Sequence, residues 1–115
     1  MQLRHSVMIG FMGRQFDRFH EYQPAHSLKE RLEMARRVHG GDGIEPVYPQ
    51  DFRPDIAESV ELMRQAGMPV SAVNVNVKGD AAFRRGSFTS PDPAVRQQAV
   101  DYLKTGMDLA AELGT

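Results

Sequence analysis

The sequence predicts an α/β protein built from three consecutive βα units with parallel strands. Short apolar segments alternate along the chain with longer segments of helical periodicity. This alternation is typical of right-handed βαβ units, whose helices cover a parallel sheet. The predicted strands lie at about 5–10, 43–48 and 70–77, and the predicted helices lie at about 28–39, 55–66 and 93–113.

The composition excludes several classes of site. The chain has 14 Lys and Arg against 15 Asp and Glu, so its overall charge gives no reason to expect nucleic acid or an anionic membrane as a partner. It has no cysteine, which excludes disulfides, thiolate metal ligands and thiol nucleophiles. No apolar run approaches the roughly 18 residues of a membrane-spanning helix. We therefore expect a cytoplasmic protein that binds neither nucleic acid nor membrane.

The first unit begins with HSVMIG at residues 5–10, a short apolar run that ends in glycine and is typical of a buried strand. Residues 11–26 have no clean period, and we expect a long loop or a partial helix there. Ser27-Leu-Lys-Glu30 is a capping box, which predicts a helix that begins at about residue 28. The two glycines after His39 end that helix.

The second and third units follow the same plan. GIEPVY, at residues 43–48, is the second candidate strand, and Pro54 suits the first turn of the helix that follows. In SAVNVNV, valines alternate with two asparagines, which is the period of a strand with one aliphatic face. Asp92-Pro93 then predicts the start of the last helix, with Asp as the N-cap and Pro at the first helical position.

The pattern indicates an incomplete architecture. Three parallel strands leave two open sheet edges, and the chain stops directly after a long helix, where another strand would begin. We therefore expect residues 1–115 to form one domain that is a fragment of a larger fold. Two completions fit: an eight-unit barrel of about 250 residues or a five-strand open sheet. A complete small α/β domain is the remaining interpretation.

Polar side chains at the carboxyl ends of the strands form the candidate site, because ligands bind there in both completions. Glu45 is a candidate catalytic base or a group that holds a sugar hydroxyl; otherwise it is a structural acid neutralised by a basic neighbour. Asn74 and Asn76 each offer a donor and an acceptor, which suits a neutral polyol or an internal amide network. Lys78 and Tyr48 complete the candidate substrate-binding residues at the strand ends.

The loop after the first strand supplies further candidates. Arg14 and Phe16 are expected to bind substrate, since charged and aromatic side chains on loops at strand ends often line pockets. His20 has Asp17 and Glu21 close by in sequence and is a candidate catalytic acid or base; an exposed surface histidine is the alternative. The sequence has no metal-ligand motif, so we expect no metal ligand in this chain.

The segment GSFTSPDPAVRQQAVDYLKTGMDLAAELGT, residues 86–115, resembles the third helical unit of the xylose-isomerase-like TIM barrels. GIEPVYP and SAVNVNV fit the second and third strands of that superfamily more loosely. The resemblance implies that this chain is the N-terminal portion of a TIM (β/α)8 barrel. It also implies a metal-dependent isomerase or epimerase that acts on a monosaccharide or related polyol.

In that superfamily the divalent metal, manganese, cobalt or magnesium, is held by two Glu, an Asp and a His from later strands. The resemblance therefore implies a metal in the complete protein and none bound to this chain alone. It carries over the substrate-pocket wall, which comprises Glu45, Asn74 and the loop around His20. It also implies a sugar substrate, with association either into a homo-oligomer or with the remaining barrel.

Two classes of function stay open. In the first, the chain is the N-terminal part of a sugar isomerase or epimerase and is inactive by itself. In the second, it is a non-enzymatic binding or assembly module that buries its open sheet edges against a partner chain.

Overall fold

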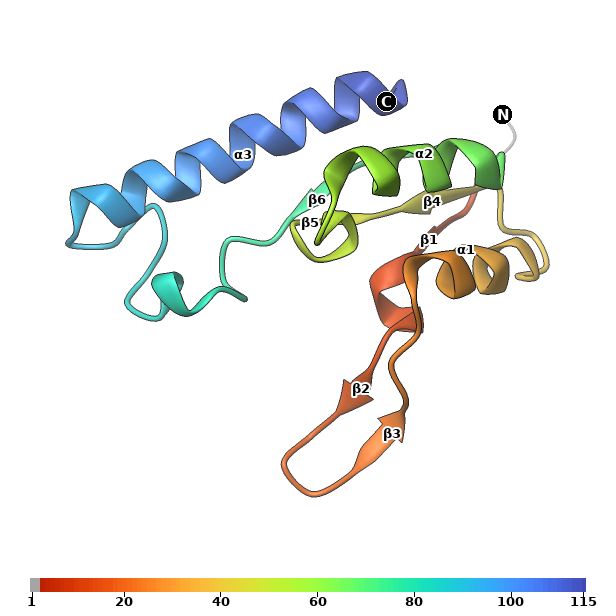
Figure 1. Ribbon diagram of the computed structural model, residues 1–115, viewed down its shortest axis with the longest axis horizontal. Helices are drawn as coiled ribbons and strands as arrows, with labels where there is room; N and C mark the ends of the chain where they lie inside the picture. Colours follow the sequence, from red (N-terminus) through yellow and green to blue (C-terminus); the bar gives the residue numbers. More distant parts are fainter. Residues whose placement is uncertain (1–2) are drawn as a thin grey trace.

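The computed structural model describes residues 3–115 and shows an α/β chain with parallel strands (Figure 1). This agrees with the α/β class predicted from the sequence. The elements are β1 (Ser6–Met8), β2 (Gln15–Phe16), β3 (Glu21–Gln23), α1 (Leu28–Arg36), β4 (Gly43–Glu45), β5 (Val47–Tyr48), α2 (Ile56–Ala66), β6 (Asn74–Val75) and α3 (Pro93–Leu113). No helix among the described residues is long and apolar enough to cross a membrane.

The parallel strands lie side by side in chain order. β1 pairs with β4 in the register Met8 to Glu45, and β5 pairs with β6 in the register Val47 to Asn74. A parallel bridge between Ile44 and Val70 links the two pairs. β4 and β5 together therefore form the central strand of the three.

All three strands are shorter than the sequence predicted. The segment predicted as a strand at 5–10 ends at Met8, because Ile9–Met12 wind into a 3₁₀ turn. The segment at 43–48 is divided at Pro46, which has no N–H to give to a strand ladder. The segment at 70–77 is regular only at Asn74–Val75, with Val70 as an isolated bridge.

The region expected to be a loop or partial helix at 11–26 contains an antiparallel hairpin, formed by β2 and β3. The Asp17 carboxylate organises its turn by accepting the N–H groups of Phe19 and His20 and the Tyr22 hydroxyl, at 2.7 to 2.8 Å. These bonds hold the pKa of Asp17 below its usual value, and the Phe19 amide contributes most to this effect. The bond to Asp17 raises the pKa of Tyr22. The hairpin projects away from the rest of the chain (Figure 1).

Helices α1 and α3 begin at the caps that the sequence predicts, whereas α2 begins at Ile56, so Pro54 lies before the helix and not in its first turn. Ser27 and Glu30 form the capping box of α1, and the Ser27 amide and hydroxyl lower the pKa of Glu30. Asp55 and Asp92 cap α2 and α3. Helix α1 ends at Arg36, earlier than the predicted residue 39. The chain leaves the helix there and turns through Gly40, whose φ of 77° favours glycine.

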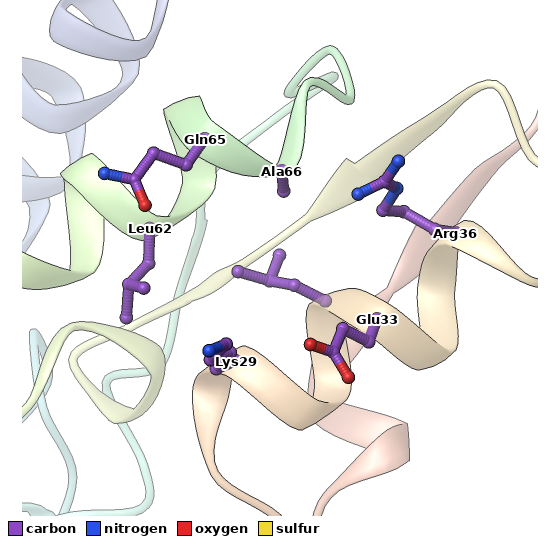
Figure 2. Close-up of a pocket in the computed structure, with 7 residues that line it drawn as sticks. Lys29, Glu33, Arg36, Leu62, Gln65 and Ala66 are labelled. Atoms are coloured by element: carbon purple, nitrogen blue, oxygen red, sulfur yellow. The ribbon is translucent and has the colours of Figure 1, made fainter.

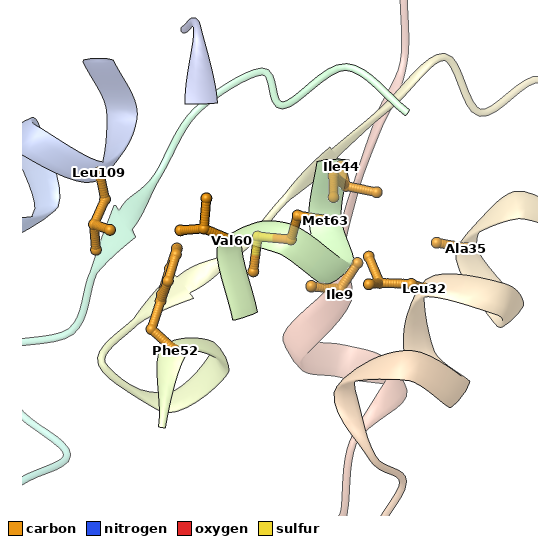
Figure 3. Packing of buried hydrophobic residues seen from close by; sticks show 8 residues of the cluster. All are labelled: Ile9, Leu32, Ala35, Ile44, Phe52, Val60, Met63 and Leu109. Carbon is orange, nitrogen blue, oxygen red and sulfur yellow. The ribbon is translucent and has the colours of Figure 1, made fainter. Parts of the chain in front are cut away.

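The core lies between the strands and the helices (Figure 3). Ile9 of the 3₁₀ turn and Ile44 of β4 meet Leu32 of α1 and Met63 of α2, and all of these side chains are buried. The other members of the buried cluster are Ala35, Phe52, Val60 and Leu109. Burial of this apolar surface supplies the main driving force for the fold.

Helix α3 packs closely on the last strand through Gly106. A Cβ at this position would lie 2.4 Å from Cγ2 of Val75, so only glycine permits the observed approach. Tyr48 also packs against the core, beside Val75 in the parallel pair. Because side chains alternate along a strand, Glu45, Val47, Asn74 and Asn76 point to the opposite face. We call this the open face.

Candidate functional site

A groove lies on the open face at the carboxyl ends of the strands. Its first part has a volume of about 490 Å³ and is lined by residues that include Gly10, Val47, Asn74, Asn76 and Lys78. Three of the sequence-predicted substrate-binding residues, the two asparagines and Lys78, therefore lie together.

A second cavity of about 350 Å³ continues the first, since both are lined by Gly10, Val47 and Asn76. We call the two cavities together the strand-end groove. The second cavity adds charged and polar side chains from the first loop, helix α1 and the turn after β5: Arg14, His26, Arg31, Gln50 and Asp51. Of these, Arg14 was predicted from the sequence as a substrate-binding residue.

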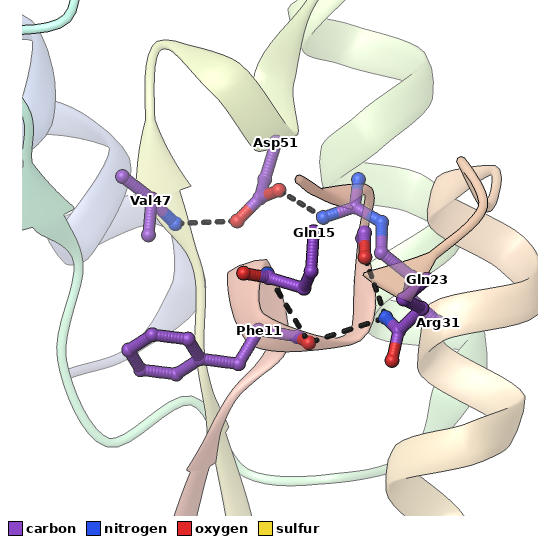
Figure 4. Close-up of polar contacts among 7 residues, drawn as sticks. Phe11, Gln15, Gln23, Arg31, Val47 and Asp51 are labelled. Atoms are coloured by element: carbon purple, nitrogen blue, oxygen red, sulfur yellow. Dashed lines mark hydrogen bonds and ion pairs between the residues drawn. The ribbon is translucent and has the colours of Figure 1, made fainter. Parts of the chain in front are cut away.

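A buried ion pair forms one wall of this groove (Figure 4). The Asp51 side chain is 2% exposed and pairs with the Arg31 guanidinium, whose side chain is 11% exposed. The other carboxylate oxygen accepts the backbone N–H of Val47 at 2.7 Å. Burial of both charges together restricts the positions of α1 and β5 relative to each other.

Two glutamine side chains attach the hairpin to the turn at Ile9–Met12 (Figure 4). Gln15 and Gln23 each donate an amide hydrogen bond to the Phe11 carbonyl, and Gln23 also donates to the Gly13 carbonyl. The base of the hairpin is therefore anchored beside the groove, although its tip projects away.

A tight turn after β6 organises the side of the groove formed by Asn76. The Asn76 Oδ1 atom accepts the N–H groups of Lys78 and Gly79 at 3.0 and 2.9 Å. A Cβ at Gly79 would lie 2.9 Å from Asn76 Nδ2 and 3.0 Å from Gln50 Nε2. Glycine at this position thus allows two side-chain amides and the backbone to approach each other closely.

Glu45 lies on the open face beside the groove. It is half-buried, and its Oε1 accepts a hydrogen bond of 3.4 Å from Asn74 Nδ2. The neutralising basic neighbour considered from the sequence does not appear among its contacts, because no ion pair of the described residues includes Glu45. An amide partner leaves the carboxylate charge available to a ligand on this face.

Three predicted site residues lie elsewhere. Tyr48 is on the opposite face, where its ring packs against Phe52 and Tyr102 at centroid distances of 6.0 and 5.5 Å. Phe16 is 61% exposed on the hairpin, with the Arg14 guanidinium 4.5 Å above its ring. His20 is exposed near the hairpin tip and stacks edge-on against Tyr22.

The acids near His20 do not orient its imidazole. Asp17 accepts hydrogen bonds from backbone amides and from Tyr22, and Glu21 pairs with Arg14 at 2.7 Å. Both carboxylates therefore stabilise the hairpin itself. The sequence showed these residues close together but did not show that a short antiparallel pairing would use the acids.

A polar cluster fixes the rear of the site. The Tyr102 hydroxyl of α3 donates to Asp80 at 3.0 Å and accepts from Arg53 at 3.1 Å. Hydrogen bonds to Asp80 lower its pKa; the bond from the Ala82 amide contributes most, and the bond from the Tyr102 hydroxyl contributes next. This cluster links the turn after β5, the loop after β6 and helix α3.

A separate cleft of about 190 Å³ lies between α1 and α2, on the helical side of the chain (Figure 2). Leu32, Leu62 and Ala66 form its apolar part, with Lys29, Glu33 and Arg36 around it. It lies away from the strand ends and contains none of the predicted site residues.

Asp51 and Arg31 were missed by sequence reasoning. Asp51 follows the cis bond between Tyr48 and Pro49 and looks in the sequence like an ordinary turn acid. The available signal was an arginine on the apolar side of the first helix, one residue before Leu32.

The described residues contain no group of three or more His, Cys, Asp or Glu side chains that could hold a metal ion. The residues of this segment thus do not fit a divalent cation site of the usual kind.

The fold and groove define a class: an α/β protein whose parallel strands present polar side chains at their carboxyl ends. The chain is 37% identical over 90 residues to a xylose isomerase of Thermus thermophilus. It is 34% identical over 90 residues to a xylose isomerase of Thermus caldophilus.

Each match covers 77% of this chain, and the matched segment spans 23% of each relative's length. No family model matches the chain. The two matches support the resemblance to the xylose-isomerase-like family that was drawn from the sequence motifs.

Proposed function

We propose that this chain contributes part of the substrate-pocket wall of a sugar isomerase or epimerase built on a TIM barrel. The strand-end groove is the observation that carries the proposal. It lies at the carboxyl ends of parallel strands, where ligands bind in such barrels, and it presents Asn74, Asn76 and Lys78 together. The similarity to two xylose isomerases supports the reaction class.

The roles of the chain's own residues follow from their contacts. Asn76 and Gln50 supply amide donors for sugar hydroxyls, and Glu45, held by Asn74, supplies an acceptor or a base on the same face. The Asp51–Arg31 pair acts by holding the groove wall. His20, Phe16 and Tyr48 have no part in this assignment.

The ligands of the implied metal are not supplied by this segment. The resemblance implies a divalent cation that stabilises charge on the reacting sugar oxygens. The described residues do not form a site for it. We propose that its ligands belong to the later strands of a complete barrel, together with the other half of the pocket.

A chimera tests the function. The 90 matched residues of the Thermus thermophilus xylose isomerase would be replaced by the matched residues of this chain, and D-xylose isomerisation would be measured with added divalent metal. We expect measurable activity that falls when Asn76→Leu is introduced into the grafted segment. Lys104→Met, on the exposed surface of α3, is the matched control.

A chimera that folds and assembles like its parent but has no activity would contradict the proposal. If the graft does not fold, the remaining segment of the relative would be expressed separately and mixed with this chain. Activity that requires both pieces would then support the same assignment, and a well-folded mixture without activity would oppose it.

The second class, a non-enzymatic binding or assembly module, is favoured by one observation. The N–H groups of Ser71, Asn74 and Asn76 pair with the central strand, so the alternate backbone groups of this segment face an open edge. A stable metal-free complex with an unrelated chain, together with an inactive chimera, would favour this class.

A further inference from the structure

The charges that line the strand-end groove are mainly positive, although the whole chain has a net charge of −1. Arg14, Arg31 and Lys78 line it, and Asp51 is the one carboxylate among the lining residues of its two cavities. Asp51 is engaged with Arg31 and with the Val47 amide. It therefore offsets one of the three cations and offers no free acceptor.

The remaining two cations differ in their surroundings. Arg14 pairs with Glu21, which lies on the hairpin outside the groove lining. Lys78 forms no ion pair within residues 3–115, and its backbone N–H is fixed by Asn76. The uncompensated charge of the groove therefore lies at Lys78, next to the tight turn.

The uncharged groups beside Lys78 are also donors. Because Asn76 Oδ1 already accepts two backbone amides, the other terminal atom of this side chain is a donor, Nδ2. Both Asn76 Nδ2 and Gln50 Nε2 lie beside Gly79, where no side chain intervenes. Glu45 lies beside the groove but is not among the lining residues of either cavity.

We propose that the ligand of the strand-end groove carries an anionic oxygen group, a carboxylate or a phosphate, that binds between Lys78, Asn76 and Gln50. This inference rests on the proposed function and specifies its substrate class as an acidic or phosphorylated sugar. Two amide donors that converge beside a cation match the oxygens of an anion, which only accept hydrogen bonds, better than the mixed donors and acceptors of a neutral polyol.

The test uses the full 115-residue chain and four probes: D-xylose, D-xylonate, D-xylose 5-phosphate and inorganic phosphate. Binding would be measured by calorimetry and by amide chemical-shift changes, at low and at high salt. We expect at least one charged sugar to bind about ten-fold or more tightly than D-xylose, because hydrogen bonds to a charged group are stronger than those between neutral groups. High salt would weaken this preference.

Two variants locate the anion. Lys78→Met and Gly79→Ala should each remove most of the preference for the charged sugar, because they delete the cation and fill the space between the two amides. Lys104→Met on α3 should leave it unchanged, and circular dichroism would verify that each variant keeps its helices.

Each outcome decides the proposal. Preference for D-xylonate would identify a carboxylate, and preference for the phosphate ester would identify a phosphate. D-xylose bound as tightly as the charged sugars would overturn the anionic group and leave the sugar function standing. Inorganic phosphate bound as tightly as the sugar phosphate would overturn the assignment of the ligand as a sugar, and failure to bind any charged sugar would overturn the anionic group. An inactive folded chimera tests the proposed function separately.

Discussion

Removal of the Asp51 carboxylate should destabilise the chain by leaving the Arg31 charge buried without a partner. Asp51 is 2% exposed and Arg31 is 11% exposed, so little water can replace the lost ion pair. Breaking a buried pair costs about 3–5 kcal/mol, most of it the cost of the uncompensated charge. The Arg31 Nε atom is already buried without a hydrogen-bond partner, which makes the guanidinium especially dependent on Asp51.

A double-mutant cycle measures this dependence. The variants are Asp51→Ala, Arg31→Met and the double variant, unfolded in urea at one protein concentration. We expect the double variant to be less destabilised than the sum of the single variants by about 2 kcal/mol or more, because removal of both charges leaves neither one buried alone. Effects that add to within about 0.5 kcal/mol would refute the reasoning.

Three further predictions concern other parts of the chain. Gly106→Ala should destabilise it by about 1–3 kcal/mol through overlap with Val75, and Val75→Ala in the same chain should recover part of this loss in urea unfolding. The pKa of Asp17 is lowered in the folded hairpin, so its ionised carboxylate stabilises the fold above the ordinary value of 3.8, and this stabilisation is lost as the pH falls through the lowered value. The Phe19 amide resonance should shift in that pH range. A resonance that does not move would contradict this prediction. The chain in isolation should form oligomers in sedimentation measurements because its sheet has open edges, whereas a monodisperse, cooperatively melting monomer would count against the barrel-fragment proposal.

The helices and their first residues could be predicted because their signals are local. The capping box of α1 and the Asp-Pro pair of α3 act within one turn of the helix they begin. Strand lengths could not be predicted in the same way. A strand extends only as far as its neighbour runs beside it, and the neighbour is distant in sequence. The 3₁₀ turn at Ile9–Met12 therefore shortened the first strand although its residues are apolar.

Part of the candidate site was predictable because the alternation of side chains along a strand is also a local signal. Asn74, Asn76 and Lys78 follow a strand whose alternation is visible in the sequence, so their shared location at a strand end could be expected. Tyr48 lies on the core face because Pro46 and Val47 continue the alternation through the break in the strand. The alternation within GIEPVY would have placed Tyr48 on the same face as Ile44, opposite Glu45, had it been extended across the proline.

The end of β1 explains why an acid follows the second strand. In the central strand, Ile44 donates its N–H towards the β6 side, to Pro69, so the N–H of Val47 points towards the β1 side. There β1 has already ended at Met8, and Val47 would have no backbone acceptor.

Asp51 supplies the missing acceptor by a 2.7 Å bond, and its remaining charge requires Arg31. The early end of β1 also leaves Gly10 and the 3₁₀ turn beside Val47, where the strand-end groove opens. Asp51→Asn keeps an acceptor for Val47 and loses only the charge, whereas Asp51→Ala loses both. The difference in unfolding free energy between these variants should therefore be about 1–3 kcal/mol, the cost of a buried N–H without an acceptor.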